Sequence, residues 1–169
     1  MRLFIAVKFE QNIINELTNI QDTLRTLNFK GRYSSVENLH LTLAFIGEYQ
    51  NPDDVINAME KIQCKQFNIS LSGYLGNFGN LIWAGMERTP ELDSYAKKLR
   101  YTLADSNIPF DKKNFNPHIT LLRHAQGQQA FSTITVKKES MTVQRISLMR
   151  SDFGKHGAVY TEIDSVQLD

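Results

Sequence analysis

The sequence predicts a duplicated α+β fold built from two closely packed lobes. The first observation is a repeat: NLHLTLAFIG at residues 38–47 returns as NPHITLLRHA at residues 116–125. Both copies keep the order Asn, any residue, His, branched aliphatic, Thr, Leu, so His40 and His118 take corresponding places in the two halves of the chain. The second observation is that a predicted strand and helix precede each copy in the same order. Such a repeat indicates an internal duplication.

The first half opens with a strand and a helix. Residues 2–9, RLFIAVKF, form a nearly continuous apolar run, which is typical of a strand covered on both faces. Steps of four and three then recur along the chain and predict a helix whose buried stripe is Ile13, Leu17, Ile20, Leu24 and Leu27. We expect this helix to end within residues 28–31, and residues 32–35 to lead to the first histidine strand.

The middle of the chain predicts a helix and a hairpin. Asn51 can cap a helix, Pro52 suits its first position, and the two carboxylates that follow favour the positive end of the helix dipole. The buried side of this helix would be Val55, Ile56, Met59 and Ile62. Residues 67–74 and 81–86 read as strands, and the Gly- and Asn-rich residues 76–80 predict the turn between them.

The second half repeats this order and ends in further strands. Thr89 followed by Pro90 predicts a helix start, and the buried stripe of that helix would be Leu92, Ala96, Leu99 and Leu103. We expect a loop at residues 108–117 that delivers the second histidine strand, and a loop or short helix at 126–131. Strands are expected at 134–136, 141–150 and 158–166, with a turn at 151–157.

Composition is that of an ordinary globular protein. Hydrophobic residues make up 41% and charged residues 22%, and the net charge is only +1. No global field therefore draws the chain to nucleic acid or membrane, so an anionic substrate must be held by a local group. Because no linker rich in Pro, Gly or Ser separates the halves, we expect residues 1–169 to form one domain of two pseudo-symmetric lobes with one His-x-Thr motif each.

Cysteine content and hydropathy favour a cytoplasmic location without a membrane segment, and we expect a monomer. Cys64 is the only cysteine, so no internal disulfide can form. The apolar run at residues 3–7 is too short for a secretion signal, and no stretch approaches the ~20 apolar residues of a membrane span.

The paired motifs are the candidate site. Side chains alternate along a strand, so His40 and Thr42 share one face, as do His118 and Thr120, while the aliphatic residues between them point to the core. If the two strands lie side by side, a cleft between them receives two imidazoles and two hydroxyls. One His-x-Thr is commonly a half-exposed surface pair, but two copies at matched positions favour catalysis.

Two imidazoles suit displacement at phosphorus. With an ordinary pKa of ~6.5, one histidine can be neutral and act as a general base while the other is protonated and acts as an acid. Each proton transfer contributes ~10²- to 10⁴-fold to the rate. Thr42 and Thr120 can donate hydrogen bonds to non-bridging phosphate oxygens, although their presence is also explained by plain strand propensity.

Arg123 and Phe45 are further candidates with one geometric condition. Each lies five residues after its histidine, and strict alternation would place it on the opposite face. Arg123 can offer its planar fork to phosphate only if its strand ends or bulges by Leu122; otherwise it is a solvated strand end. Phe45 would stack on a nucleobase or belong to the core.

No metal or cofactor is expected. Neither motif contains a carboxylate or a third ligand at zinc spacing, and no Gly-rich loop ends in Lys-Ser/Thr. His124 and His156 have no partner in the repeat, and we interpret them as a surface residue and a turn residue.

The chain resembles the 2H phosphoesterase superfamily, in particular its RNA 2′,3′-cyclic phosphodiesterase, or 2′-5′ RNA ligase-like, branch. The resemblance rests on RLFIAV, ENLHLTLAFIG, LIWAG, NFNPHITLLR and SLMRSDF…GAVYTEI, which extend over nearly the whole chain. It implies two mainly antiparallel sheets flanking a central water-filled cleft, with helices on the outer faces. It also implies metal-independent opening of a 2′,3′-cyclic phosphate at an RNA 3′ end to a 2′-phosphomonoester.

The resemblance implies roles for individual residues. His40 would be the acid and His118 the base, although the sequence leaves the exchange of these roles open. Thr42, Thr120 and Arg123 would hold the phosphate, with Phe45 and Tyr160 near the base. The segment RYSSVENLH lacks the aromatic and proline-containing run common in the family, so substrate contacts there differ.

Three alternatives remain at this stage. The substrate could be another small phosphodiester, such as a 2′-5′-linked oligoadenylate or a nucleotide cyclic phosphate. The chain could instead be a non-catalytic module that binds RNA ends or nucleotides. It could also be a structural domain whose histidines are incidental.

Overall fold

The computed structural model describes residues 1–169 and contains three α-helices and nine strands. In chain order the elements are β1 (Arg2–Lys8), α1 (Gln11–Thr26), β2 (Lys30–Tyr33), a 3-10 turn (Val36–Asn38), β3 (His40–Glu48), α2 (Pro52–Glu60), β4 (Phe67–Phe78), β5 (Leu81–Met86), α3 (Pro90–Asp105), β6 (His118–Gln126), a second 3-10 turn (Phe131–Thr133), β7 (Ser140–Val143), β8 (Arg145–Gly154) and β9 (Gly157–Gln167). The predicted α+β class is confirmed.

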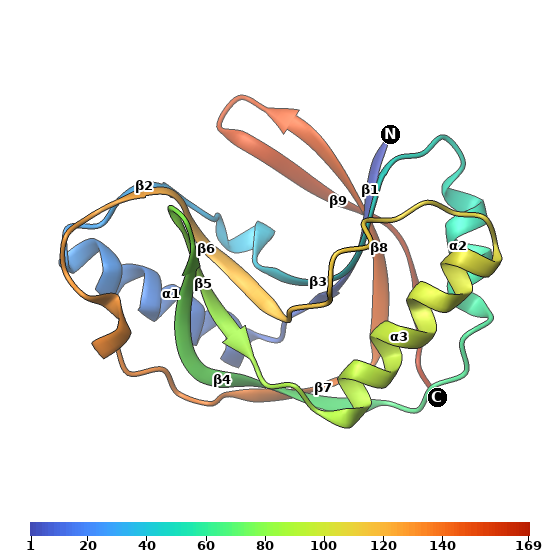
Figure 1. The fold of residues 1–169 in the computed structure, drawn as a ribbon, viewed down its shortest axis with the longest axis horizontal. Helices are drawn as coiled ribbons and strands as arrows, with labels where there is room; N and C mark the ends of the chain where they lie inside the picture. The colour runs from blue at the N-terminus through green and yellow to red at the C-terminus, as the bar shows by residue number, and fades with distance from the viewer.

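The strands form two antiparallel sheets, as predicted. The first sheet has four strands in the order β3-β1-β8-β9, and the second has five in the order β2-β6-β5-β4-β7. Each sheet carries one histidine strand, and β3 and β6 lie next to each other where the sheets meet (Figure 1). Each sheet also takes strands from both halves of the chain, because β2 joins the second sheet and β8 and β9 join the first.

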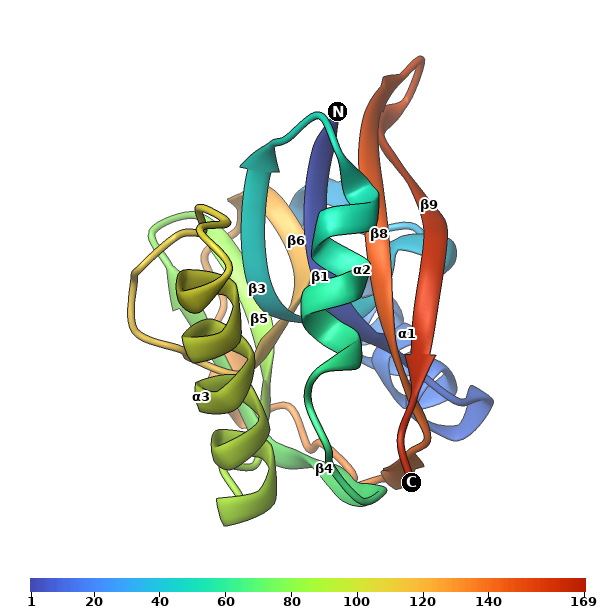
Figure 2. The ribbon, with the colours of Figure 1, turned by 90° about the vertical axis from the view of Figure 1, so that its right-hand side faces the viewer.

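The helices lie on the outer faces. Helices α2 and α3 cover the first sheet on the side away from the second sheet (Figure 2), and α1 packs against β6 and β7 of the second sheet. One continuous cluster of 37 buried residues contains side chains from both sheets and all three helices, so the two sheets share a core. None of the helices is long and apolar enough to cross a lipid bilayer.

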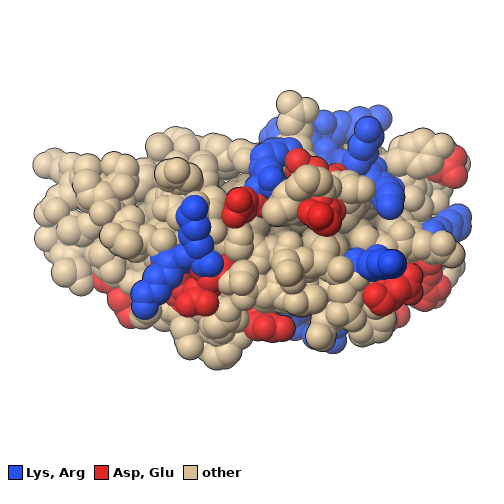
Figure 3. All heavy atoms as spheres, turned by 90° about the horizontal axis from the view of Figure 1, so that it is seen from below, with Lys and Arg blue, Asp and Glu red and all other residues tan.

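Charges of both signs are mixed on the face of the molecule shown in Figure 3. Seen from below, basic and acidic side chains lie next to one another, and one end of the molecule is almost free of charge (Figure 3). This mixture agrees with the net charge of +1.

The predicted helix starts differ in how they are capped. The Thr89 hydroxyl accepts a hydrogen bond from the Leu92 N–H at 3.2 Å, as a capping residue should. Asn51 occupies the corresponding place before α2, but its side chain donates to the Asp54 carboxylate at 3.0 Å instead of accepting from the backbone. The helix boundary was therefore correct at both places, and the capping bond forms at only one.

The β4–β5 hairpin turns later than predicted. Only Gly79 and Asn80 form the turn, and Gly76 lies inside β4 opposite Trp83. A Cβ at Gly76 would come within 2.3 Å of the Trp83 ring, so this glycine makes room for an indole and does not mark a turn.

The C-terminal region contains three errors of prediction, and the first is the turn expected at 151–157: β8 continues to Gly154, so only residues 155 and 156 separate it from β9. Residues 134–136 are not a strand; the backbone N–H of Lys137, just after them, donates to the Glu16 carboxylate on α1 at 2.6 Å, so this segment follows the helix. The apolar run 141–150 is not one strand, because the chain leaves the second sheet after β7 and enters the first sheet at β8. Residues 158–166 do lie in one strand, β9.

Candidate active site

The two histidines begin the two histidine strands. His40 is the first residue of β3 and His118 is the first residue of β6. Both side chains are half-buried, as are Thr42 and Thr120, while the aliphatic residues that alternate with them are buried. The alternation predicted from the sequence is therefore present in both strands. We call the side of each sheet that carries these residues its histidine face.

Each imidazole is held in the same way. The Nδ1 atom of His40 lies 2.6 Å from the Asn38 carbonyl oxygen, and Nδ1 of His118 lies 2.6 Å from the Asn116 carbonyl oxygen. A carbonyl only accepts hydrogen bonds, so each Nδ1 carries the hydrogen and each Nε2 is left for chemistry. This contact gives the asparagine position of the repeat a role through its backbone carbonyl.

The two Nε2 atoms have different surroundings. Nε2 of His40 lies 2.8 Å from the Thr42 hydroxyl, which donates to it when the imidazole is neutral. The Nε2 atom of His118 and the Thr120 hydroxyl make no hydrogen bond within the chain. One histidine of the pair is thus already engaged by its threonine, and the other is open.

Burial keeps His40 neutral in the unliganded protein. Its pKa is lowered, first because burial disfavours the charged form and then through the positive charges of Arg123 and His118. The hydrogen bond to Asn38 opposes this shift. Arg123 and His118 lie on β6 of the second sheet, and β6 contacts the His40 strand β3 where the sheets meet.

A β-bulge in each histidine strand meets the geometric condition stated for Arg123 and Phe45. In β6, Thr120 and Leu122 pair with consecutive residues of β5, which leaves Leu121 as the extra residue. In β3, Leu43 is the extra residue by the same pattern against β1. Each bulge shifts the alternation of side chains by one residue, so Arg123 and Phe45 lie on the same face as the histidine of their strand.

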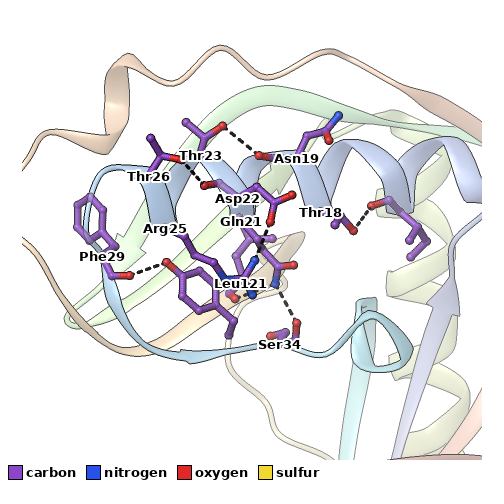
Figure 4. Close-up of polar contacts among 12 residues, drawn as sticks. Thr18, Asn19, Gln21, Asp22, Thr23, Arg25, Thr26, Phe29, Ser34 and Leu121 are labelled. Carbon is purple, nitrogen blue, oxygen red and sulfur yellow. Dashed lines mark hydrogen bonds and ion pairs between the residues drawn. The ribbon is translucent and has the colours of Figure 1, made fainter.

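A buried glutamine holds the bulge of β6. Gln21 of α1 is 2% exposed, and its amide donates to the Leu121 carbonyl at 3.1 Å and to the Ser34 carbonyl at 2.9 Å (Figure 4). The Ser34 hydroxyl donates to the Thr120 carbonyl at 2.8 Å. The sequence analysis missed Gln21, although a glutamine between Leu17 and Leu24 in an apolar stripe is a recognisable signal.

Aromatic rings flank both imidazoles. Tyr160 stands edge-on to His40 with ring centroids 5.2 Å apart, and Phe4 lies 4.9 Å from the same ring. Phe78 stands edge-on to His118 at 5.2 Å, and Trp83 lies 6.1 Å away. Tyr160 was predicted to be near the site, whereas the other three rings lie outside the repeat and were missed.

Phe45 packs within the first sheet. Its ring is stacked with Phe4 at 6.3 Å, and the Arg2 guanidinium lies 5.2 Å from its centroid. Phe45 is half-buried and belongs to the small cluster of Phe4, Ala6 and Met149, not to the main core. Phe45 thus packs against a small hydrophobic cluster apart from the main core, and its contact with a base stays a prediction.

The remaining candidates lie outside this arrangement. His156 is exposed in the two-residue turn between β8 and β9, and His124 is exposed near the end of β6, as predicted. No three His, Cys, Asp or Glu side chains gather where they could hold a metal ion. A surface hollow of about 500 Å³ lies at the far end of β3 from His40, lined by Met1, Glu48, Tyr49, Gln50 and Asn51.

One protein family matches the part of the chain that contains both histidine motifs. The family model described as the 2′-5′ RNA ligase superfamily matches residues 9–155. The chain belongs to the 2′-5′ RNA ligase superfamily. The resemblance read from the sequence is confirmed.

Two relatives that match this chain over nearly its full length are both named RNA 2′,3′-cyclic phosphodiesterase. The RNA 2′,3′-cyclic phosphodiesterase of Escherichia coli K12 is 29% identical over 175 residues, covering 96% of this chain and 93% of the relative. That of Thermotoga maritima is 26% identical over 184 residues, covering 100% and 96%.

A solved structure of the superfamily superimposes over its full length. E. coli LigT complexed with 3′-AMP matches with a TM-score of 0.83 and 28% identity, covering 99% of this chain and 96% of that one. Other crystals of E. coli LigT contain ATP or NADP+. E. coli LigT therefore binds nucleotides.

Proposed function

We propose that this chain is an RNA 2′,3′-cyclic phosphodiesterase that opens the cyclic phosphate at an RNA 3′ end to a 2′-phosphomonoester. The observation that carries the proposal is the matched pair of imidazoles. Both hold Nδ1–H on an asparagine carbonyl, and they lie on strands of two different sheets that contact each other. The names of the full-length relatives support the same activity.

The substrate phosphate would be held by one charge and two hydroxyls. Arg123 is exposed on its histidine face and forms no salt bridge, so its fork is free for non-bridging oxygens. The Thr120 hydroxyl also has no partner within the chain. Both groups can stabilise charge that develops on the phosphate in the transition state.

Substrate binding would protonate His40 and release Thr42. In the free protein His40 is neutral and accepts from the Thr42 hydroxyl. An anionic phosphate favours the charged imidazole and raises its pKa. Once Nε2 takes a proton from solvent it can no longer accept from Thr42, so the hydroxyl donates to the phosphate and Nε2–H is available for O3′. His40 is then the acid, the role that the family resemblance implies.

His118 would then be the base. Its Nε2 atom has no partner within the chain and can accept a proton from water. The water oxygen forms a bond to phosphorus, the bond from phosphorus to O3′ breaks, and O3′ takes the proton from His40. The phosphate stays on O2′. Each proton transfer is expected to contribute ~10²- to 10⁴-fold.

Phosphorus NMR of the product tests this proposal. Purified protein with excess EDTA should convert a 2′,3′-cyclic-phosphate oligonucleotide or 2′,3′-cyclic AMP to the 2′-phosphomonoester. His40→Ala and His118→Ala should each lower the rate with 2′,3′-cyclic AMP by ~10²- to 10⁴-fold, and His156→Ala should leave it unchanged. No ring opening, a 3′-phosphate product, or loss of activity to EDTA would contradict the proposal.

The same assay separates the alternatives. A panel with 2′-5′-linked oligoadenylate and other nucleotide cyclic phosphates identifies a different preferred substrate. A non-catalytic module would bind these ligands equally well after His40→Ala or His118→Ala and would give no product in the parent.

A further inference from the structure

A second exposed arginine lies beside Arg123. Arg32 of β2 pairs directly with Arg123 of β6, so the two side chains share a face of the second sheet. Both arginines are exposed, and neither forms a salt bridge. Like charges directly opposite each other destabilise a sheet. The pair is therefore unexplained within the free protein and suits a ligand with more than one phosphate.

The β8–β9 hairpin brings an aromatic ring to the same region. The hairpin projects from the first sheet, and its Ala158 carbonyl accepts from the Asn38 side chain at 2.8 Å (Figure 1). At its tip, a Cβ at Gly157 would lie 3.6 Å from the Arg32 side chain. The tip thus reaches from the first sheet to the arginine of the second.

Phe153 lies on the histidine side of this hairpin. Ser151 pairs with Tyr160 and Phe153 pairs with Ala158, so Phe153 and Tyr160 share one face. Tyr160 contacts the His40 ring, and Phe153 lies two residues, about 7 Å, further along the hairpin. Phe153 is 96% exposed, which leaves its whole ring open to a base.

Charges around Phe153 favour an anionic chain. Lys155 is exposed in the hairpin turn, and Asp152 points to the other face, where it is bound to Arg150 at 3.0 Å. An exposed aromatic ring beside unpaired cations is the combination that single-stranded nucleic acids use, with bases stacked on rings and phosphates on basic groups.

We infer that Arg32 and Phe153 bind the RNA strand upstream of the cyclic phosphate, Arg32 at the phosphate before the terminal nucleotide and Phe153 stacked on the preceding base. This hairpin track, defined as Arg32, Phe153 and Lys155, rests on the proposed function. It makes the end of an RNA strand a better substrate than a mononucleotide.

The test compares kcat/KM for a single-stranded tetranucleotide ending in a 2′,3′-cyclic phosphate with that for 2′,3′-cyclic AMP. Phe153→Ala should lower the value for the tetranucleotide roughly 5- to 50-fold, as expected for loss of one stacked base, and leave the mononucleotide unchanged. Tyr101→Ala, at another exposed aromatic on α3, and Val159→Ala, on the other face of the hairpin, should change neither value. Equal losses for both substrates, or none, would overturn the inference.

Binding separates failure of this inference from failure of the proposed function. A fluorescent tetranucleotide ending in a 2′-phosphate is titrated without turnover, at several salt concentrations. Arg32→Gln should weaken binding and lower the slope of log affinity against log salt by about 0.7, the contribution of one phosphate contact to a single strand. If the parent turns over neither substrate but Arg32→Gln and Phe153→Ala each weaken RNA binding, only the proposed function fails. If the parent does not bind the RNA, or binds it as well after both substitutions, the hairpin track is refuted.

Discussion

Phe45 and Arg123 occupy equivalent positions in the two histidine strands. Each lies five residues after its histidine, and each reaches the histidine face because a bulge at Leu43 or Leu121 shifts the alternation by one residue. The duplicated strands thus keep the same backbone irregularity while one copy presents an aromatic ring and the other a cation. The ring packs beside Phe4, and the cation is free for phosphate.

Arg123 should act on the rate more than on stability. It is exposed and has no salt bridge, so Arg123→Gln should leave the melting temperature unchanged. Removing one preorganised donor to the developing charge costs about 10²- to 10³-fold in kcat. Arg123→Lys should recover part of this loss because the charge remains but the fork does not. Steady-state kinetics with 2′,3′-cyclic AMP measures both; an unchanged kcat in Arg123→Gln would remove Arg123 from the site.

Gln21 should position Arg123 through the bulge. Gln21→Leu removes the amide donor from the part-buried Ser34 carbonyl and the buried Leu121 carbonyl, which should cost about 1–3 kcal/mol of stability and loosen β6 at Leu121. Glu16→Leu is the matched control, because Glu16 is also buried on α1 but bonds Lys137, outside β6. At a temperature where both variants are folded, kcat should fall in Gln21→Leu alone. Equal kcat in the two variants would reduce Gln21 to a purely structural role.

Anion binding should be coupled to the protonation of His40. Its pKa is lowered in the free protein, so the imidazole there is neutral until the pH falls through that lowered value. Sulfate, whose charge is constant between pH 5 and 8, favours the protonated form; its affinity should therefore rise as the pH falls, and it should raise the pKa of His40. An NMR titration with and without sulfate measures the pKa directly, with exposed His156 as the reference. A pKa of His40 that sulfate leaves in place would contradict the proposed release of Thr42.

Replacing the residues that precede α2 and α3 should lower the stability of the protein by different amounts. Thr89→Ala removes a capping bond and should lower the free energy of unfolding by ~1 kcal/mol. Asn51→Ala removes only an exposed bond to Asp54 and should cost a few tenths of that. Urea denaturation of both variants checks the comparison. A cost for Asn51→Ala equal to that for Thr89→Ala would mean that the Asn51 side chain caps α2 in solution.

Residue spacing predicted the features of the fold that depend on residues close together in the sequence. The helix stripes of α1 and α3, the alternation around His40 and His118, and the need for a bulge before Arg123 were all readable from residue spacing. Which sheet each strand joins was not, because strand pairing depends on contacts far apart in sequence. The apolar run 141–150 shows this: nothing in its pattern marks Gln144 as the point where the chain passes between sheets.

The surroundings of the site were predicted less completely than its centre. The histidines and threonines form a repeat, so their spacing identified them. Phe4 and Trp83 contact the imidazoles from neighbouring strands whose register the sequence does not encode locally. Gln21 acts through carbonyl oxygens of another element, and only its place in an apolar stripe could have marked it.

The dependence of kcat/KM on pH, measured for the parent, His40→Ala and His118→Ala with 2′,3′-cyclic AMP, tests the pairing of the two imidazoles most directly. Acid and base on one phosphorus predict a bell-shaped profile for the parent. The residual activity of His40→Ala should lose the fall at high pH, and that of His118→Ala should lose the fall at low pH. A bell that persists in both variants would place the reacting proton donor and acceptor elsewhere in the molecule.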